Sequence, residues 1–116
     1  MKETIPPLYN LSYLKSLSND ASFLQKMIGL YLKNTPELVD SFRNAFPERK
    51  PEVLAEALHK LKSAAAAIGM EATKKNIEEM EQRIRSGQTT HIPEEALFAI
   101  ADQFDTCISQ LEEITL

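Results

Sequence analysis

The sequence predicts an all-α protein: an antiparallel up-down four-helix bundle with a short extra helix at its N-terminal end. Apolar residues recur at spacings of three and four over four long segments, glycine occurs only three times, and the connections are short. A length of 116 residues is enough for one hydrophobic core. We therefore expect one domain spanning residues 1–116, in which residues 1–9 form a flexible N-terminal arm.

The first two helices follow a Pro6-Pro7 break. Asn10 is a good N-cap residue for a short helix whose apolar face carries leucine at positions 11, 14 and 17. Ser18-Asn19-Asp20 then predicts a stop and a new cap. The second helix keeps its apolar phase across Pro36, so we expect one long kinked helix rather than two. Its predicted buried face consists of Leu24, Met27, Ile28, Tyr31, Thr35, Leu38, Val39, Phe42 and Phe46.

The last three helices are bounded by proline and glycine. Pro51 suits the first turn of the third helix, and Gly69 suits its left-handed C-cap. The fourth helix is expected to end at Ser86-Gly87, and Pro93 to start the fifth. Their predicted buried positions are Leu54, Ala57, Leu58, Leu61, Ala64, Ala65 and Ile68; then Met70, Thr73, Ile77, Met80 and Ile84; then Leu97, Ile100, Phe104, Ile108 and Leu111.

The composition excludes several classes of function. The net charge is −4, and no basic stripe with interleaved aromatic residues indicates nucleic-acid binding. The single cysteine, Cys107, rules out an internal disulfide and is best read as a small core residue. With no membrane-length apolar run and no signal-peptide core, we expect a cytoplasmic protein that does not bind membranes. The Met1 start and the length lead us to expect a free-standing protein.

His59 is the strongest candidate for chemistry. At about 100° per residue it projects almost opposite the centre of the buried stripe of the third helix, so it should face water. Ala55, Ser63 and Ala66, all small, share that side with it, as does Lys62 one turn away. A neutral imidazole is a good nucleophile near pH 7. If it accepted a phosphoryl group, Lys62 would neutralise part of the added charge, and the small residues would let a partner close over the ring.

These residues also resemble a known family, the histidine-containing phosphotransfer domain of two-component phosphorelays. The motif reads Ala57-Leu58-His59-Lys60-Leu61-Lys62-Ser63, with Gly69 following. The upstream stretches at residues 10–14 and 31–38 are similar too, so the resemblance covers nearly the whole chain. Ser63 departs from the family pattern, in which glycine is most frequent at this position. Because serine is still small, we expect slightly altered docking rather than loss of function.

The resemblance implies roles for particular residues. His59 would be the phosphoacceptor and Lys62 the lysine that stabilises phosphohistidine, while the Ser63 hydroxyl would be able to bond to the phosphoryl group. A polar residue on the next helix often holds the other imidazole nitrogen, and Glu78, Glu81 and Gln82 are the candidates. The protein would be a phosphoprotein and a phosphoryl carrier, not an enzyme.

The implied partners are response-regulator receiver domains and, in some pathways, a hybrid sensor histidine kinase. The chain would have no intrinsic cofactor, because the receiver would bring Mg²⁺ and most catalytic groups. We expect a monomer. Docking beside His59 would use Ala55, Ala66 and an apolar patch of Phe23, Met27 and Leu30 on a flank of the second helix. Packing of that patch against the first helix is the equally weighted alternative.

Three other functions fit parts of the pattern. A sensor-kinase dimerisation domain usually has an acidic residue after the histidine, where this chain has Lys60. A di-iron bundle would use the Glu56-x-x-His59 spacing, but it needs a second copy that His91 does not provide; Glu56 is better placed to pair with Lys60. Two histidines and one cysteine at these separations make no recognisable zinc site. A non-catalytic interaction bundle shares the fold and would leave His59 dispensable.

Overall fold

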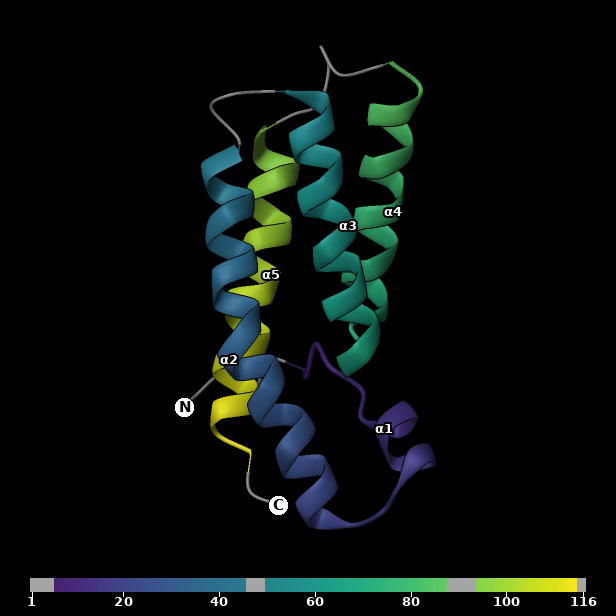
Figure 1. Cartoon of the computed structure of the whole chain (residues 1–116), viewed down its shortest axis with the longest axis vertical. Coiled ribbons are helices and arrows are strands. Elements are labelled where there is room, and N and C mark those ends of the chain that lie inside the picture. Colours follow the sequence, from purple (N-terminus) through teal and green to yellow (C-terminus); the bar gives the residue numbers. More distant parts are fainter. Residues whose placement is uncertain (1–5, 46–49, 88–93, 115–116) are drawn as a thin grey trace.

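The computed structural model describes residues 6–45, 50–87 and 94–114, and within these ranges the regular structure is entirely helical. Five helices follow one another along this described part of the chain, and Figure 1 shows their arrangement. They are α1 (Ser12–Leu17), α2 (Ala21–Ala45), α3 (Pro51–Ile68), α4 (Glu71–Arg85) and α5 (Glu94–Glu112). The predicted fold class is therefore confirmed. Phe46, His91 and Pro93 lie outside the described residues.

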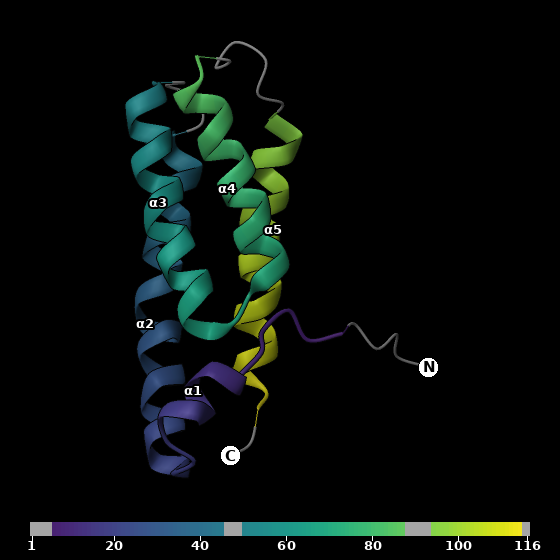
Figure 2. The same cartoon turned by 90° about the vertical axis from the view of Figure 1, so that its right-hand side faces the viewer.

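The four long helices run antiparallel, and α1 lies across one end of the bundle (Figures 1 and 2). At 1.5 Å per residue, α2 is about 37 Å long and α3 about 27 Å, so the N-terminal turns of α2 extend beyond α3. Residues of α1 contact α3 at that end. The short helix thus closes the part of the core that α3 does not reach.

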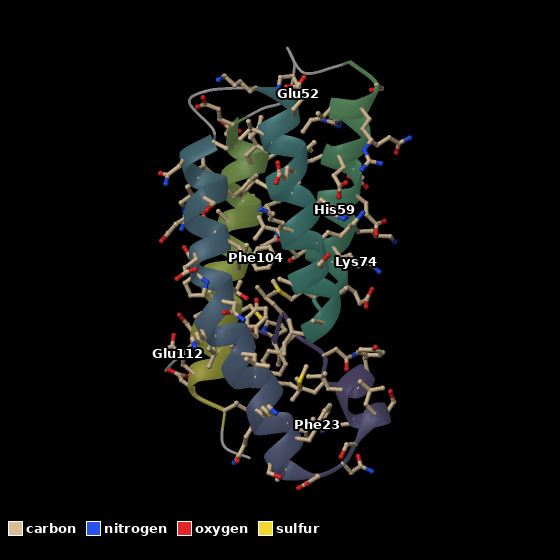
Figure 3. All side chains as sticks on the ribbon, in the orientation of Figure 1. Phe23, Glu52, His59, Lys74, Phe104 and Glu112 are labelled. Atoms are coloured by element: carbon tan, nitrogen blue, oxygen red, sulfur yellow. The ribbon has the colours of Figure 1, made fainter. Side chains whose placement is uncertain are left out.

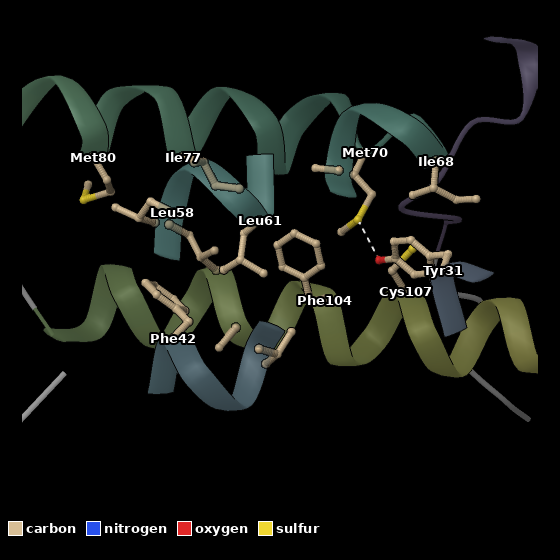
Figure 4. Close-up of a cluster of buried hydrophobic side chains, with 14 of the residues drawn as sticks. Tyr31, Phe42, Leu58, Leu61, Ile68, Met70, Ile77, Met80, Phe104 and Cys107 are labelled. Atoms are coloured by element: carbon tan, nitrogen blue, oxygen red, sulfur yellow. Dashed lines mark hydrogen bonds between the residues drawn. The ribbon is translucent and has the colours of Figure 1, made fainter. Parts of the chain in front are cut away.

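The core is formed by the predicted apolar stripes. Phe42, Leu58, Leu61 and Phe104 meet at its centre without solvent exposure (Figure 4). Five predicted core positions are instead only partly buried at its margin: Met27, Leu38, Ala57, Ala64 and Ile108. Cys107 is fully buried, as expected for a small core residue. The apolar face of each long helix packs against the apolar faces of its neighbours, so the buried residues follow the helical spacing seen in the sequence.

A small polar group interrupts the apolar core near α1. The Tyr31 hydroxyl donates a hydrogen bond to the Met70 sulfur at 3.2 Å, beside Cys107 (Figure 4). Burial raises the pKa of both ionisable groups: that of the Cys107 thiol rises to about 11, and that of the Tyr31 hydroxyl rises further. Both side chains are therefore held in their neutral forms.

Most of the predicted helix boundaries are confirmed. α2 continues through Pro36 as one helix, although proline removes one backbone donor. The predicted N-cap of α1 is wrong by one residue: Leu11 holds the N-cap position, and the carboxamide of Asn10, just before it, accepts the Ser12 N–H at 2.9 Å. Asp20 accepts the Ser22 N–H at 3.1 Å and so caps α2, and Pro51 occupies the first turn of α3.

Gly69 ends α3 in the left-handed conformation, with φ 75° and ψ 33°. The N-terminal segment is hydrogen-bonded to the same turn, because the Asn10 N–H donates to the Ile68 carbonyl at 3.0 Å. A Cβ atom at residue 69 would lie 2.0 Å from the Asn10 carbonyl oxygen. Glycine is thus required there both by the positive φ angle and by the close approach of the N-terminal segment at Asn10.

The N-terminal arm is described only from Pro6 onward, and there it is tied to α5. The Leu8 N–H donates to the Gln110 side-chain oxygen at 2.9 Å, and the Gln110 amide donates to the Pro6 carbonyl at 3.1 Å. Leu8 and Tyr9 are partly buried against the core. Within the described part of the chain, no helix is long and apolar enough to cross a membrane.

Candidate functional site

His59 stands on the outer face of α3, near the middle of the bundle (Figure 3). Its side chain is 61% exposed, whereas Leu58 beside it in sequence is fully buried. This contrast follows from helical geometry, because consecutive residues are rotated by about 100°. The predicted exposure of the imidazole is confirmed.

Glu81 on α4 is the side chain that the fold brings to the imidazole. The Gly69 turn makes α3 and α4 antiparallel, and His59 and Glu81 lie at nearly equal distances in sequence from that turn. The Glu81 Oε2 atom lies 3.9 Å from the Nδ1 atom of His59. Glu78 and Gln82, the other two candidates, are exposed.

Two further cations share the Glu81 carboxylate. The Lys62 Nζ atom lies 3.2 Å from Oε1, and an Arg85 guanidinium nitrogen donates a hydrogen bond to Oε2 at 3.2 Å. The contact of Lys62 is an ion pair outside hydrogen-bond geometry, which leaves Oε1 buried with no hydrogen bond. We call these four residues, His59, Lys62, Glu81 and Arg85, the Glu81 cluster.

The burial of Glu81 gives this cluster its electrostatic character. Only 4% of its side chain is exposed, although a buried carboxylate costs several kcal/mol unless other groups compensate it. Lys62 is 28% exposed and Arg85 69% exposed, so both cations reach the carboxylate from the surface. The cluster beside His59 thus consists of one buried negative charge and two positive charges nearer the surface.

The remaining neighbours of His59 on α3 are small or paired elsewhere. Ala55 is half-buried, whereas Ser63 and Ala66 are exposed, so nothing bulky from α3 covers the ring. The Ser63 hydroxyl donates to the His59 carbonyl at 3.4 Å, a local helix contact. Lys60 pairs with Glu56 at 3.4 Å, as predicted, and therefore belongs to a different charge group from Lys62.

The apolar residues expected to receive a partner lie apart from His59. Leu38 on α2 lines a groove together with Ala57 and Lys60 on α3. Leu38 therefore lies at about the same height along the bundle as His59. At 1.5 Å per residue, Leu30 is about 12 Å and Phe23 about 22 Å further along α2, and Figure 3 shows Phe23 toward the end that carries α1. Phe23 and Met27 are partly buried against the core, while Leu30 is 43% exposed.

Arg85 is the residue of the Glu81 cluster that the sequence reasoning missed. The available signal was its position four residues after Glu81, a spacing that allows an acid–base pair on a helix. Without knowing which of the three candidates on α4 faces α3, however, the sequence does not single out Arg85. Among the described residues, no three histidine, cysteine, aspartate or glutamate side chains are grouped to hold a metal ion.

Comparison with known proteins adds independent information. A family model described as the Hpt domain matches residues 26–114. A solved structure of the HPT domain from a hybrid sensor histidine kinase of Shewanella superposes with a TM-score of 0.76 at 20% identity. The match covers 91% of this chain and 92% of that chain, and shows that the two share a fold. No curated protein matches the chain.

Proposed function

Because this chain belongs to the Hpt domain family, whose members act in two-component phosphotransfer, we propose that His59 carries a phosphoryl group between the aspartates of receiver domains. The observation that best supports this role is an exposed imidazole beside a carboxylate that also pairs with two cations. The other histidine, His91, lies outside the described residues. The chain would act as a carrier and not as an autonomous kinase.

The orientation of the imidazole favours Nε2 as the attacking atom. Nδ1 faces Glu81, which favours the tautomer with its proton on Nδ1 and leaves the Nε2 lone pair free. In the transfer, Nε2 attacks phosphorus, the N–P bond forms, and the bond from phosphorus to the aspartyl oxygen breaks. That bond's electron pair stays on the aspartate. The ring keeps its Nδ1 proton, and Glu81 offsets the positive charge that the ring gains.

Lys62 and Ser63 would stabilise the phosphoryl group once His59 has accepted it. The dianionic group is best stabilised by charge and positioning, because phosphoryl transfer needs little covalent help from the carrier. Lys62 supplies a mobile ammonium on the same side of α3 as His59, and the Ser63 hydroxyl is exposed one turn beyond His59. Rotation of that hydroxyl away from the His59 carbonyl would let it donate to a phosphoryl oxygen.

The receiver partner completes the reaction centre. It would bring Mg²⁺ and the aspartate, and close over the ring past Ala55 and Ala66. Leu30, the most exposed residue of the apolar patch on α2, would extend this surface along the helix, whereas Phe23 and Met27 are partly buried against the core. We expect the protein to work as a cytoplasmic monomer, with a receiver of a hybrid kinase as one possible donor.

Intact-mass spectrometry tests the function directly. The purified chain is mixed with a phosphorylated receiver domain and Mg²⁺ and kept at neutral or alkaline pH. We expect the native chain and His91→Gln to gain one phosphoryl group, and His59→Gln to gain none while remaining helical by circular dichroism. Failure of the folded native chain to gain a phosphoryl group from several receivers would favour an interaction bundle instead.

A further inference from the structure

From the Glu81 cluster we infer that Glu81 keeps phosphorylated His59 short-lived, making it a state for onward transfer and not for storage. This inference rests on the proposed function and extends it to a positioning residue that does not itself touch the phosphoryl group. Two physical effects of the buried carboxylate act in the same direction, one through the cations and one through the imidazole proton.

The first effect is competition for positive charge. Lys62 and Arg85 are each 3.2 Å from a Glu81 oxygen, so both cations already have an anionic partner before any phosphoryl group arrives. Phosphorylation adds about two negative charges on the ring that lies beside the same carboxylate. The two anions then repel one another and share the same two cations. A neutral side chain at position 81 would release both cations to the phosphoryl group.

The second effect concerns the leaving group. When the phosphoryl group departs, the electron pair of the N–P bond returns to Nε2, and an imidazole that is already protonated on Nδ1 leaves as a neutral ring. Glu81 Oε2 lies 3.9 Å from Nδ1, and the carboxylate is only 4% exposed. Its negative charge is therefore weakly screened by solvent and favours the proton on Nδ1. The carboxylate thus helps the ring to release the group.

The buried Oε1 atom of Glu81 is compensated by an ion pair with Lys62 and not by a hydrogen bond. Among the described residues it has no hydrogen-bond partner, and the ammonium of Lys62 lies 3.2 Å from it. A carboxylate that served packing alone would be expected to have its oxygens satisfied by hydrogen bonds. Arg85 is 69% exposed, so one of the two cations that compensate the Glu81 carboxylate lies mainly at the surface.

The lifetime of the phosphorylated chain, measured without any receiver, tests this inference. His59 is loaded chemically with phosphoramidate, the reagent is removed, and the loss of the phosphoryl mass is followed over time. We expect Glu81→Gln to lengthen the lifetime about two- to fivefold, the range of one partly solvated charge interaction. Arg85→Gln, which leaves the carboxylate less compensated, is expected to shorten it. The matched controls Glu78→Gln and Arg83→Gln, exposed on the same helix, should not change it.

The two variants of the cluster predict shifts of opposite sign, which a loss of fold common to both would not produce, and circular dichroism checks that each variant is folded. The shift of Arg85→Gln should shrink as salt is raised, because Arg85 is 69% exposed, whereas the shift of Glu81→Gln should change less, because the carboxylate is buried. An unchanged or shorter lifetime in folded Glu81→Gln would overturn the inference while leaving phosphoryl transfer intact. If Glu81→Gln does not fold, an unchanged or longer lifetime of Arg85→Gln would overturn it. If the native chain takes no phosphoryl group from phosphoramidate or a receiver, the proposed function itself fails.

Discussion

His59 and Glu81 have opposite surroundings although their closest polar atoms are only 3.9 Å apart. The imidazole is mostly in water, while the carboxylate is almost wholly inside the bundle. An exposed nucleophile can be reached by a partner, and a buried anion beside it keeps its electrostatic strength. Lys62 spans the two environments, because its stem is covered and its ammonium reaches the Glu81 carboxylate.

Substitution of Lys62 tests the role of that ammonium. Lys62→Gln removes a charge that stabilises the phosphoryl group, so we expect the fraction of chain phosphorylated at equilibrium with a receiver to fall about two- to fivefold. Lys60→Gln is the matched control, since Lys60 is next to His59 in sequence but pairs with Glu56. An equal fall in both variants, measured by intact mass, would mean that net charge rather than position matters.

The raised pKa values of Cys107 and Tyr31 should make the free energy of unfolding depend on pH. The folded-state pKa of Cys107, about 11, exceeds the ordinary value of 9.0, so folding favours the protonated thiol. Its contribution is complete below pH 9 and is lost as the pH rises toward 11. We expect urea titrations to show the free energy of unfolding falling by roughly 1–3 kcal/mol over this range. Tyr31 adds to the fall at higher pH.

Cys107→Ala separates the two groups. It removes the thiol while leaving the Tyr31 hydroxyl, so the fall in the free energy of unfolding between pH 9 and 11 should become shallower. Equal slopes for Cys107→Ala and the native chain would show that the thiol does not titrate within this interval.

At the scale of the element, the turn between α3 and α4 sets the register of the site. Gly69 ends α3 and lets the chain reverse, and that reversal places Glu81 opposite His59. The turn also binds the N-terminal segment through the Ile68 carbonyl, so three parts of the chain meet at one residue. The geometry of the functional site thus depends on a position that has no side chain.

Gly69→Ala should therefore be strongly destabilising. The new Cβ atom combines a left-handed backbone angle with a clash against the Asn10 carbonyl oxygen, and we expect a loss of about 2–4 kcal/mol. Gly29→Ala, inside α2 with nothing within 4 Å of the added atom, should instead gain about 0.5–1 kcal/mol. Chemical denaturation of both variants checks the contrast, which similar effects of the two substitutions would contradict.

The helices were predictable from sequence because their signals are local. Pro51 and Gly69 mark the two ends of α3. The helical spacing of its apolar residues places His59 on the outward face. The choice of Glu81 over Glu78 and Gln82 was left open, although Glu81 lies four residues after Ile77 and three before Ile84, on the predicted apolar stripe of α4. Arg85 was missed because its partner Glu81 had not been singled out. The close approach of Asn10 to Gly69 joins residues far apart in sequence, which no local pattern records.

At the scale of the whole molecule, the bundle is a rigid support that holds one face of α3 open to a partner. The hydrophobic stripes of four helices meet in one core, and α1 closes the end that α3 leaves uncovered. Between helices the core is supplemented by a few polar contacts: Arg43 on α2 pairs with Asp102 and Asp105 on α5, and the Thr73 hydroxyl donates to Gln103 at 2.7 Å. His59 is carried on the outside of this scaffold, and Glu81 is the residue of the site that is buried within it.

Substitution in the core should therefore change stability without changing the chemistry of the folded fraction. Phe104 is fully buried at the centre of the bundle, and Phe104→Ala should cost about 3–5 kcal/mol. At a temperature where the variant is still folded, we expect its phosphoryl acceptance per folded molecule to equal that of the native chain. Loss of acceptance in a variant shown to be folded would mean that the core and the site are coupled.

Onward transfer is the most direct test of the central claim that this chain is a phosphoryl carrier. The native chain is loaded at His59, freed of donor, and mixed with an unphosphorylated receiver domain and Mg²⁺, and the intact masses of both proteins are followed. We predict that the chain loses its phosphoryl group as the receiver gains it, faster than the chain alone loses it to water. Retention of the group until it appears as free phosphate, with several receivers, would contradict the claim.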